Sequence, residues 1–366
     1  MALSERNDFF MQRCIDLAEK GRGFVNPNPM VGCVIVKNGN IVGEGYHERF
    51  GGHHAEVRAL RQAGKRAKGA TAYVNLEPCA HFGKTPPCTA ALIKAGVSHV
   101  VASSTDPNPL ISGMGFAKLR RAGIRVTTGV LRSRSKKLNE KFFFFMTDGL
   151  PFVAVKVAQT LDGRIADLKG GSKWITGDSA RAYGHALRAE YDAVMVGSTT
   201  VLRDDPELTV RAVKGRNPVR VILDGRFRIG GQKKIFETRK APTVVLTSIS
   251  ALRHNRAKAI ALEKKGVQVI GVISAAGISG LAVLKVLCGL GITSVLIEGG
   301  STTIGPFLES ELVNKVHCFI TPGLLGSGLA GFSFGRRRLQ RALRLADISV
   351  RPLSGDLVLE GAVKYP

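Results

Sequence analysis

Three residues with metal-ligating side chains and one acidic residue form the most informative pattern in the sequence. His54 begins a His-Ala-Glu triplet that ends at Glu56, Cys79 follows Pro78, and Cys88 comes nine residues after Cys79. One imidazole and two thiolates are three zinc ligands, and a catalytic zinc keeps a fourth position for water. Zinc lowers the pKa of that water toward neutrality. We expect Glu56 to take a proton from the water and to deliver it to a departing amine.

Each of these residues taken alone has a simpler interpretation. A histidine can cap a helix, and single cysteines are often ordinary buried residues. The combination of His-x-Glu with a later Pro-Cys is the signature of zinc nucleobase deaminases, which favours the metal site. His53 lies beside His54, so the ligand could be either histidine, and the His-x-Glu register favours His54.

The elements that must position these residues alternate between helix and strand. Helices are expected near the start of the chain, from His54 and after Cys88, and strands at 31–36, 41–45, 72–76, 97–102 and 124–128. This alternation is typical of a sheet covered by helices. The basic stretch 131–141 reads as a linker, and Gly149-Leu150-Pro151 is a second break. We therefore predict two domains, 1–148 and 149–366.

The second domain is predicted to be another α/β domain with a mostly parallel sheet. Helices are expected at 179–190 and 302–311 and an antiparallel return at 356–360, with strands at 152–158, 193–197, 219–224, 243–247, 267–272, 294–298 and 316–320. The segment from Val269 to Ile297 contains a single charged residue, Lys285, and is long enough to suggest a membrane span. Glycines interrupt this segment, so strand, helix and strand fit it better.

The composition indicates a globular chain with a large basic excess. Its 366 residues include 53 Lys and Arg against 28 Asp and Glu, a net charge of +25. The excess is spread over both halves, with local clusters at 132–141 and 336–344, and it fits solvated faces, phosphorylated substrates or RNA. The first residues do not resemble a secretory signal, and six cysteines then indicate reduced thiols or metal ligands. We expect a cytoplasmic protein.

The cysteine spacing separates this chain from deaminases of nucleic acids and nucleosides, which carry Pro-Cys-x-x-Cys. The segment 78–88, together with 26–32 and 106–109, resembles the deaminase half of the bifunctional riboflavin-biosynthesis deaminase/reductases. The resemblance implies a cytidine-deaminase-like α/β/α domain with zinc on His54, Cys79 and Cys88 and with Glu56 as the proton shuttle. It also implies substrate contacts from Asn28, His47, His81 and Lys84. His53 departs from the family, which has proline there.

The second half resembles the dihydrofolate-reductase-like half of the same family, through segments 156–166, 172–176, 196–201, 204–211, 297–300 and 322–326. Gly299 and Gly300 lie between an apolar strand and a helix, where phosphate binds well, but a Gly-x-Gly-x-x-Gly fingerprint is absent. The resemblance implies NADPH contacts from Ala158, Trp174, Thr200, Asp204, Gly225, Gly300, Ser301, Thr302, Thr303, Ile304, Gly305 and Pro306. It implies substrate contacts from Ser172, Arg188, Leu208, Arg211 and Glu298. Lys156 and Asp204 are polar candidates near the reacting sugar carbon.

The family resemblance implies two successive reactions. The first hydrolytically deaminates 2,5-diamino-6-(5-phosphoribosylamino)pyrimidin-4(3H)-one, and the second uses NADPH to reduce the ribosyl side chain to 5-amino-6-(5-phosphoribitylamino)uracil. We expect zinc and NADPH as cofactors, small phosphorylated pyrimidines as partners, a homo-oligomer, and neither nucleic acid nor membrane binding. Two alternatives stay open: a deaminase with a vestigial reductase domain, and an RNA-binding or RNA-editing protein that uses the basic charge.

Overall fold

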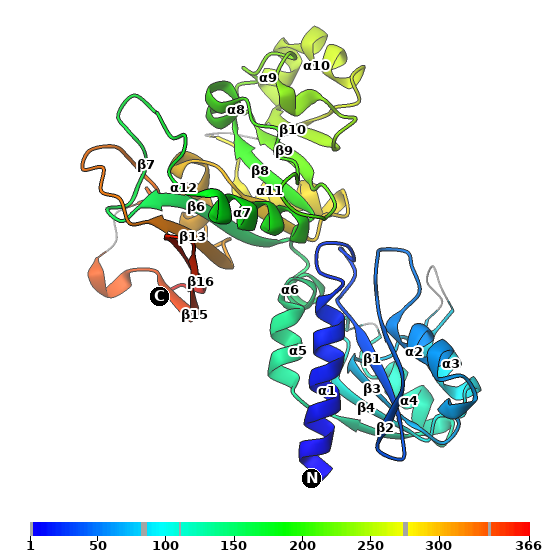
Figure 1. Ribbon diagram of the computed structural model, residues 1–366. Coiled ribbons are helices and arrows are strands. Elements are labelled where there is room, and N and C mark those ends of the chain that lie inside the picture. Colours follow the sequence, from blue (N-terminus) through cyan, green and yellow to red (C-terminus); the bar gives the residue numbers. More distant parts are fainter. Residues whose placement is uncertain (1–2, 82–85, 110, 274–276, 336–337) are drawn as a thin grey trace. The chain divides into compact units, whose positions relative to one another are not determined.

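The computed structural model describes residues 3–81, 86–109, 111–273, 277–335 and 338–366. They fall into two compact units, Met1–Gly149 and Leu150–Pro366 (Figure 1). Each unit has its own sheet and its own buried apolar clusters. The predicted α/β class is confirmed in both units.

The first unit is built on a five-stranded sheet with the order β2-β1-β3-β4-β5. Its strands are β1 Gly32–Lys37, β2 Asn40–Tyr46, β3 Thr71–Leu76, β4 His99–Ser104 and β5 Arg125–Thr128. The first two form an antiparallel hairpin, β3 runs antiparallel to β1, and β3, β4 and β5 are parallel. Strands β3 and β4 are almost entirely buried, as expected for parallel strands covered on both faces.

Helices cover both faces of this sheet (Figure 1). They are α1 Leu3–Glu19, α2 Ala55–Ala63, α3 Cys88–Lys94, α4 Met114–Arg121, α5 Arg132–Leu138 and α6 Glu140–Asp148. Residues of α2, α3 and α4 share one apolar cluster with the sheet, and residues of α1 and α5 share the cluster on the opposite face. The N-terminal ends of α2 and α3 bring His54 and Cys88 near the end of β3, which Cys79 follows.

The second unit contains a nine-stranded sheet with the order β11-β10-β9-β8-β12-β6-β13-β16-β15. Its strands are β6 Phe152–Thr160, β8 Ala193–Gly197, β9 Val219–Leu223, β10 Thr243–Ser248, β11 Gln268–Val272, β12 Ser294–Ile297, β13 Lys315–Thr321, β15 Arg344–Leu353 and β16 Asp356–Lys364. The strands are parallel except for β16 and β15, which return antiparallel at one edge. A separate small ribbon pairs β7 Arg164–Ala166 with β14 Leu329–Ala330.

The helices of the second unit are α7 Asp178–Glu190, α8 Ser198–Asp204, α9 Ile249–His254, α10 Arg256–Glu263, α11 Gly280–Gly289 and α12 Ser301–Glu309. One apolar cluster joins the sheet to α11 and α12, and another joins β8, β9 and β10 to α8 and α10. The segment considered as a membrane span contains most of β11 and all of α11 and β12. Within the described residues, no helix is both long enough and apolar enough to cross a membrane.

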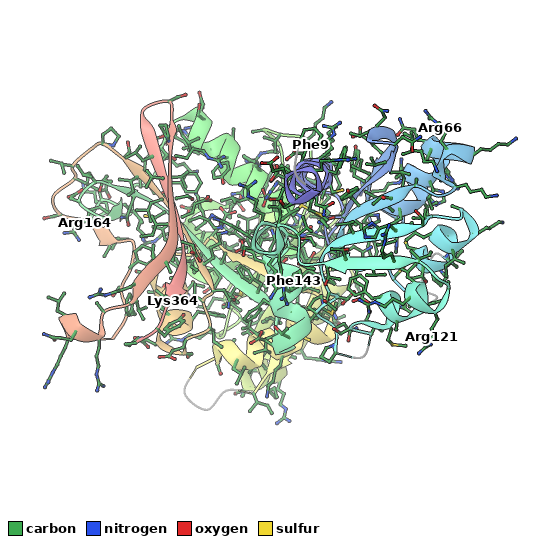
Figure 2. The ribbon with its side chains drawn as sticks, turned by 90° about the horizontal axis from the view of Figure 1, so that it is seen from below. Phe9, Arg66, Arg121, Phe143, Arg164 and Lys364 are labelled. Atoms are coloured by element: carbon green, nitrogen blue, oxygen red, sulfur yellow. The ribbon has the colours of Figure 1, made fainter. Side chains whose placement is uncertain are left out.

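The prediction of a linker at 131–141 is wrong, because this segment is helical. Helix α5 turns Ser135 and Leu138 toward the sheet, where both are buried, and the Ser135 hydroxyl donates to the carbonyl of Asn75 at 2.6 Å. Its basic residues lie on the exposed side. Elsewhere in the unit, Arg66 and Arg121 project outward from the surface (Figure 2). The basic composition here is therefore a solvated face on an amphipathic helix rather than the mark of a linker.

Candidate active sites

The three predicted zinc ligands converge at the end of β3. His54 is the N-cap of α2, Cys88 is the first residue of α3, and the ligand atoms of His54, Cys79 and Cys88 all lie within 4.8 Å of one another. His54 Nδ1 lies 3.1 Å from Cys88 Sγ and 3.6 Å from Cys79 Sγ. Two sulfurs and one imidazole nitrogen are a donor set that zinc prefers. The residues present therefore fit a zinc ion with one coordination position left for water.

The electrostatics of the two thiols also fit a cation. A hydrogen bond from Cys88, and then one from His54, hold the pKa of Cys79 well below its usual range, although burial opposes this. The neighbouring Cys79 and then burial raise the pKa of Cys88. Two buried thiolates at this distance repel each other, so both can ionise together only beside a positive charge.

Glu56 lies in the first turn of α2, two residues after His54, and is nearly fully buried, with 3% of its surface exposed. Burial, followed by the charge of Cys79, raises the pKa of its carboxyl group. Its Oε2 atom has no hydrogen-bond partner among the residues that the structure describes. A buried carboxyl oxygen without a partner beside a metal-ligand triad is suited to hold and transfer a proton.

A cavity of about 330 Å³ opens beside Glu56 and His54. Predicted substrate residues Asn28, His47 and His81 line it together with Cys79. The His47 ring bridges two neighbours: Nδ1 donates to the carbonyl of His53 at 3.1 Å, and Nε2 then accepts from the Asn28 amide at 3.1 Å. Burial lowers the pKa of His47, which favours this neutral form. The fourth predicted contact, Lys84, lies outside the described residues.

Sequence reasoning missed the role of Glu77, which lines this cavity and fixes a neighbouring backbone segment. Its buried carboxylate accepts four backbone N–H groups, from Asp106 and Gly113 at Oε2 and from Gly115 and Phe116 at Oε1, at 2.8–3.2 Å. These bonds fix the chain between β4 and α4, which brings Asp106 and Asn108 to the cavity. An acidic residue at the end of a buried strand was the available signal.

The second unit has a cavity of about 800 Å³ at the carboxyl ends of β6, β8 and β12. This is the edge where ligands bind in parallel α/β sheets. Many of the predicted cofactor and substrate residues line it: Ala158, Ser172, Thr200, Asp204, Gly225, Glu298, Gly300, Ser301, Thr302, Thr303 and Pro306. Ile304 and Gly305 are instead buried within α12.

Two glycines allow the first turn of α12 to approach the sheet. A Cβ atom on Gly299 would lie 2.7 Å from Cβ of Thr303, and one on Gly197 would lie 2.4 Å from Oγ1 of Thr303. Both distances are too short for any side chain, so the close approach requires glycine. The N-terminus of α12 therefore faces the cavity with backbone N–H groups that suit a phosphate. This donor set fits the diphosphate of a nicotinamide nucleotide.

A buried charge cluster contributes Lys156 and Glu298 to the lining of this cavity. Glu298 accepts two hydrogen bonds from the Arg188 guanidinium, at 2.6 and 2.9 Å, and their side chains are only 8% and 16% exposed. Burial opposes ionisation of Glu298, but Arg188 and then Lys156 lower the pKa of its carboxyl group. Burial lowers the pKa of Lys156, a trend that Glu298 opposes. Lys156 and Glu298 line the cavity, whereas Arg188 does not line it and holds Glu298 through the two hydrogen bonds.

The remaining predicted reductase residues do not line this cavity. Trp174 is 72% exposed, and the Arg181 guanidinium lies 4.6 Å from its ring centroid. Leu208 is buried with φ +52°, and Arg211 forms an ion pair with Glu207 at 2.6 Å. The separation of Leu208 and Arg211 from the cavity could not be anticipated, because it depends on contacts within the 205–217 loop.

Comparisons with known proteins cover both units. Residues 4–104 match the family model of the cytidine and deoxycytidylate deaminase zinc-binding region, and residues 151–359 match that of the RibD C-terminal domain. These matches confirm the predicted fold class.

Curated relatives match this chain along nearly the whole length of both sequences. Riboflavin biosynthesis protein RibD of Aquifex aeolicus is 46% identical over 351 residues, which cover 96% of each chain. The corresponding Escherichia coli protein is 39% identical over 370 residues, or 97% and 98% of the two chains. Among solved structures, Acinetobacter baumannii RibD superposes with a TM-score of 0.90 at 40% identity, covering 99% of both chains. A deaminase/reductase from Thermotoga maritima has a TM-score of 0.87 at 41% identity with the same coverage.

Proposed function

Since this chain belongs to the RibD family, the bifunctional deaminase/reductases of riboflavin biosynthesis, we propose that its two units carry out successive reactions on one phosphorylated pyrimidine. Unit Met1–Gly149 deaminates 2,5-diamino-6-(5-phosphoribosylamino)pyrimidin-4(3H)-one, and unit Leu150–Pro366 then reduces the ribosyl side chain. We place the domain boundary after residue 148, one residue before the boundary between the two units. The convergence of three zinc ligands beside the partnerless carboxyl oxygen of Glu56 carries the proposal.

In the deaminase site we assign zinc to His54, Cys79 and Cys88. Zinc supplies a Lewis acid that activates water when it is bound. Glu56 holds the proton that leaves the water and delivers it to the amine that departs as ammonia. Asn28 and His47 orient the pyrimidine edge, since their hydrogen-bonded side chains line the cavity next to Glu56. His81 and Lys84 complete the proposed substrate contacts.

In the reductase site we assign NADPH to the 800 Å³ cavity. The nucleotide supplies a hydride to C1′ of the opened sugar. The first turn of α12, from Gly300 to Thr303, binds its phosphates, while Thr200 and Asp204 line the same cavity. Lys156 and Glu298 face the reacting sugar, and Arg188 and Arg211 contribute to the substrate site. The intact set of lining residues favours a working reductase over a vestigial one.

Trp174 makes this cofactor assignment testable, because it is the sole tryptophan of the chain. We expect NADPH to quench Trp174 emission with saturation and to gain sensitised nicotinamide emission, since Trp174 lies two residues along the chain from Ser172, which lines the cavity. NADH should bind at least about tenfold more weakly, because Arg203, on the cavity wall, offers a guanidinium to the extra phosphate. Titrations of the wild type and of Arg203→Met with each nucleotide measure both effects. Linear, unsaturable quenching by NADPH would support the vestigial alternative.

The remaining assignments concern partners and location. We propose small phosphorylated pyrimidines as substrates rather than nucleic acids, because the 330 Å³ deaminase cavity matches a small molecule. We place the enzyme in the cytoplasm, where reduced thiols and a reduced nicotinamide nucleotide are available.

We also propose a homo-oligomer. Edge strand β15 exposes Ile348 and Val350 by 57% and 59%, and a second copy would cover them.

A further inference from the structure

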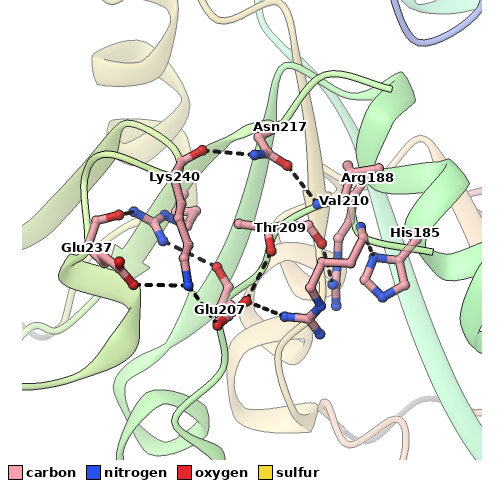
Figure 3. A network of polar contacts seen from close by, with 10 residues as sticks. His185, Arg188, Glu207, Thr209, Val210, Asn217, Glu237 and Lys240 are labelled. Carbon is pink, nitrogen blue, oxygen red and sulfur yellow. Dashed lines mark hydrogen bonds and ion pairs between the residues drawn. The ribbon is translucent and has the colours of Figure 1, made fainter. Parts of the chain in front are cut away.

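One histidine of the second unit is hydrogen-bonded to the backbone of the loop that carries Arg211. Nδ1 of His185, on α7, accepts the N–H of Arg211 at 3.2 Å. Arg188 lies one turn further along the same helix and donates to the carbonyl of Thr209 at 3.2 Å. Two side chains of α7 therefore hold two backbone groups of one short segment (Figure 3).

The same segment is held from its other side. The N–H of Val210 donates to Oδ1 of Asn217 at 2.7 Å, and the amide of Asn217 donates in turn to the carbonyl of Lys240 at 2.8 Å (Figure 3). Residues 205–211 form neither helix nor strand, so side chains replace the ladder that would otherwise fix this backbone. The position of Arg211 therefore depends on these few acceptors.

We propose that neutral His185 is a positioning residue of the reductase site, which holds Arg211 where it binds the phosphate of the substrate. The inference rests on the proposed function, which assigns that phosphate to Arg211. Because Nδ1 accepts a hydrogen bond, the neutral ring carries its proton on Nε2. Protonation places a hydrogen on Nδ1, which removes the acceptor and sets a cation against the Arg211 N–H. The hydrogen bond from the Arg211 N–H is then lost.

The charges around His185 keep the ring neutral near pH 7. It is half-buried, and burial, then the guanidinium groups of Arg188 and Arg211, lower its pKa. Glu298 and the carbonyl of Thr209 oppose this shift. The hydrogen bond from the Arg211 N–H to His185 is consequently present at neutral pH and is lost only in acid.

Two substitutions separate the acceptor from the titration. His185→Asn keeps an acceptor, since its Oδ1 is the same number of bonds from Cα as Nδ1, but it does not titrate between pH 5 and 8. His185→Leu removes the acceptor. We expect His185→Leu to raise KM for the reductase substrate about five- to tenfold at pH 7.5, the value of one hydrogen bond, with kcat and NADPH affinity within about twofold. His185→Asn should restore most of the wild-type KM.

The pH profile of KM gives the decisive comparison. The second ionisation of the substrate phosphate lies near pH 6 and affects every variant equally, so the ratio of KM between wild type and His185→Asn isolates the histidine. We expect this ratio to rise about fivefold or more between pH 7.5 and 5.5. His254→Asn, at an exposed histidine of the same unit, is the control and should keep the wild-type profile.

Arg211→Gln in the same assay distinguishes the positioning role of His185 from the assignment of the substrate phosphate to Arg211. If it raises KM while His185→Leu does not, or while the ratio stays flat with pH, the positioning role is wrong and the assignment of Arg211 stands. If Arg211→Gln leaves KM unchanged, the phosphate assignment itself is wrong, and the inference about His185 is wrong with it. Should His185→Leu fail to fold, the comparison between wild type and His185→Asn still decides.

Discussion

Replacing Glu56 by glutamine is expected to lower the rate of ammonia release by about 10²- to 10⁴-fold, the usual contribution of a general acid–base group. Glutamine has nearly the same size, so the cavity and the ligand triad should keep their geometry. It cannot take a proton from water, and among the described residues no other buried carboxyl oxygen beside the zinc ligands lacks a hydrogen-bond partner. Zinc content should stay near that of the wild type, about one ion per chain.

The measurement is ammonia release together with metal analysis of the purified protein. Cys88→Ser is the matched metal variant and should lose most of its zinc, because serine is a poor zinc ligand at this position. Glu19→Gln, at a carboxylate that is 55% exposed in the same unit, is the control and should leave both readings unchanged. Wild-type turnover in Glu56→Gln would rule out the proposed proton shuttle.

Replacing Arg188 by methionine is expected to destabilise the second unit by about 3–5 kcal/mol at pH 7. The substitution removes the guanidinium that is bidentate to Glu298 and leaves that carboxylate buried beside Lys156 alone. The Arg211→Met variant is the control. Its ion pair with Glu207 involves a guanidinium that is 54% exposed, so its loss should cost less than about 1 kcal/mol.

This effect should depend on pH with a defined sign. Arg188 helps to lower the pKa of Glu298 in the folded state, so the pair stabilises the fold above the ordinary carboxyl pKa and less as the pH falls below it. The difference between wild type and Arg188→Met should therefore shrink below about pH 4.5. Urea unfolding followed through Trp174, which lies in the second unit, measures it. A difference below 1 kcal/mol at pH 7 would contradict the buried-pair account.

The features that could be predicted from the sequence are those that depend on the spacing of residues within short segments. His54 and Cys88 begin helices and Cys79 follows a strand, and the apolar patterns of these elements are clear, so the convergence of the three ligands was foreseeable. Strand β8 begins and ends at the predicted residues because it is short and apolar, follows Asp192 and ends at Gly197, directly before helix α8. The fold class followed from the same alternation of apolar strands and amphipathic helices.

The features that sequence reasoning missed depend on partners far along the chain. Glu77 acts through backbone groups that are 29 to 39 residues away, and Arg188 through Glu298, which is 110 residues away. Strand β15 was not predicted because most of its residues are exposed, which removes the apolar alternation that marks a half-buried strand. Polar contacts of this kind carry no periodic signal, so only the tertiary structure reveals them.

The most direct test follows ammonia and NADPH together in one reaction of zinc-loaded protein with the diaminopyrimidinone phosphate. We predict that ammonia appears first and that NADPH oxidation follows after a lag, until the two amounts are equal. Glu56→Gln should suppress both signals with this substrate and should leave reduction of the pre-formed deaminated substrate intact. Oxidation of NADPH without release of ammonia, or release of ammonia that is never followed by oxidation of NADPH, would contradict two successive reactions on one pyrimidine.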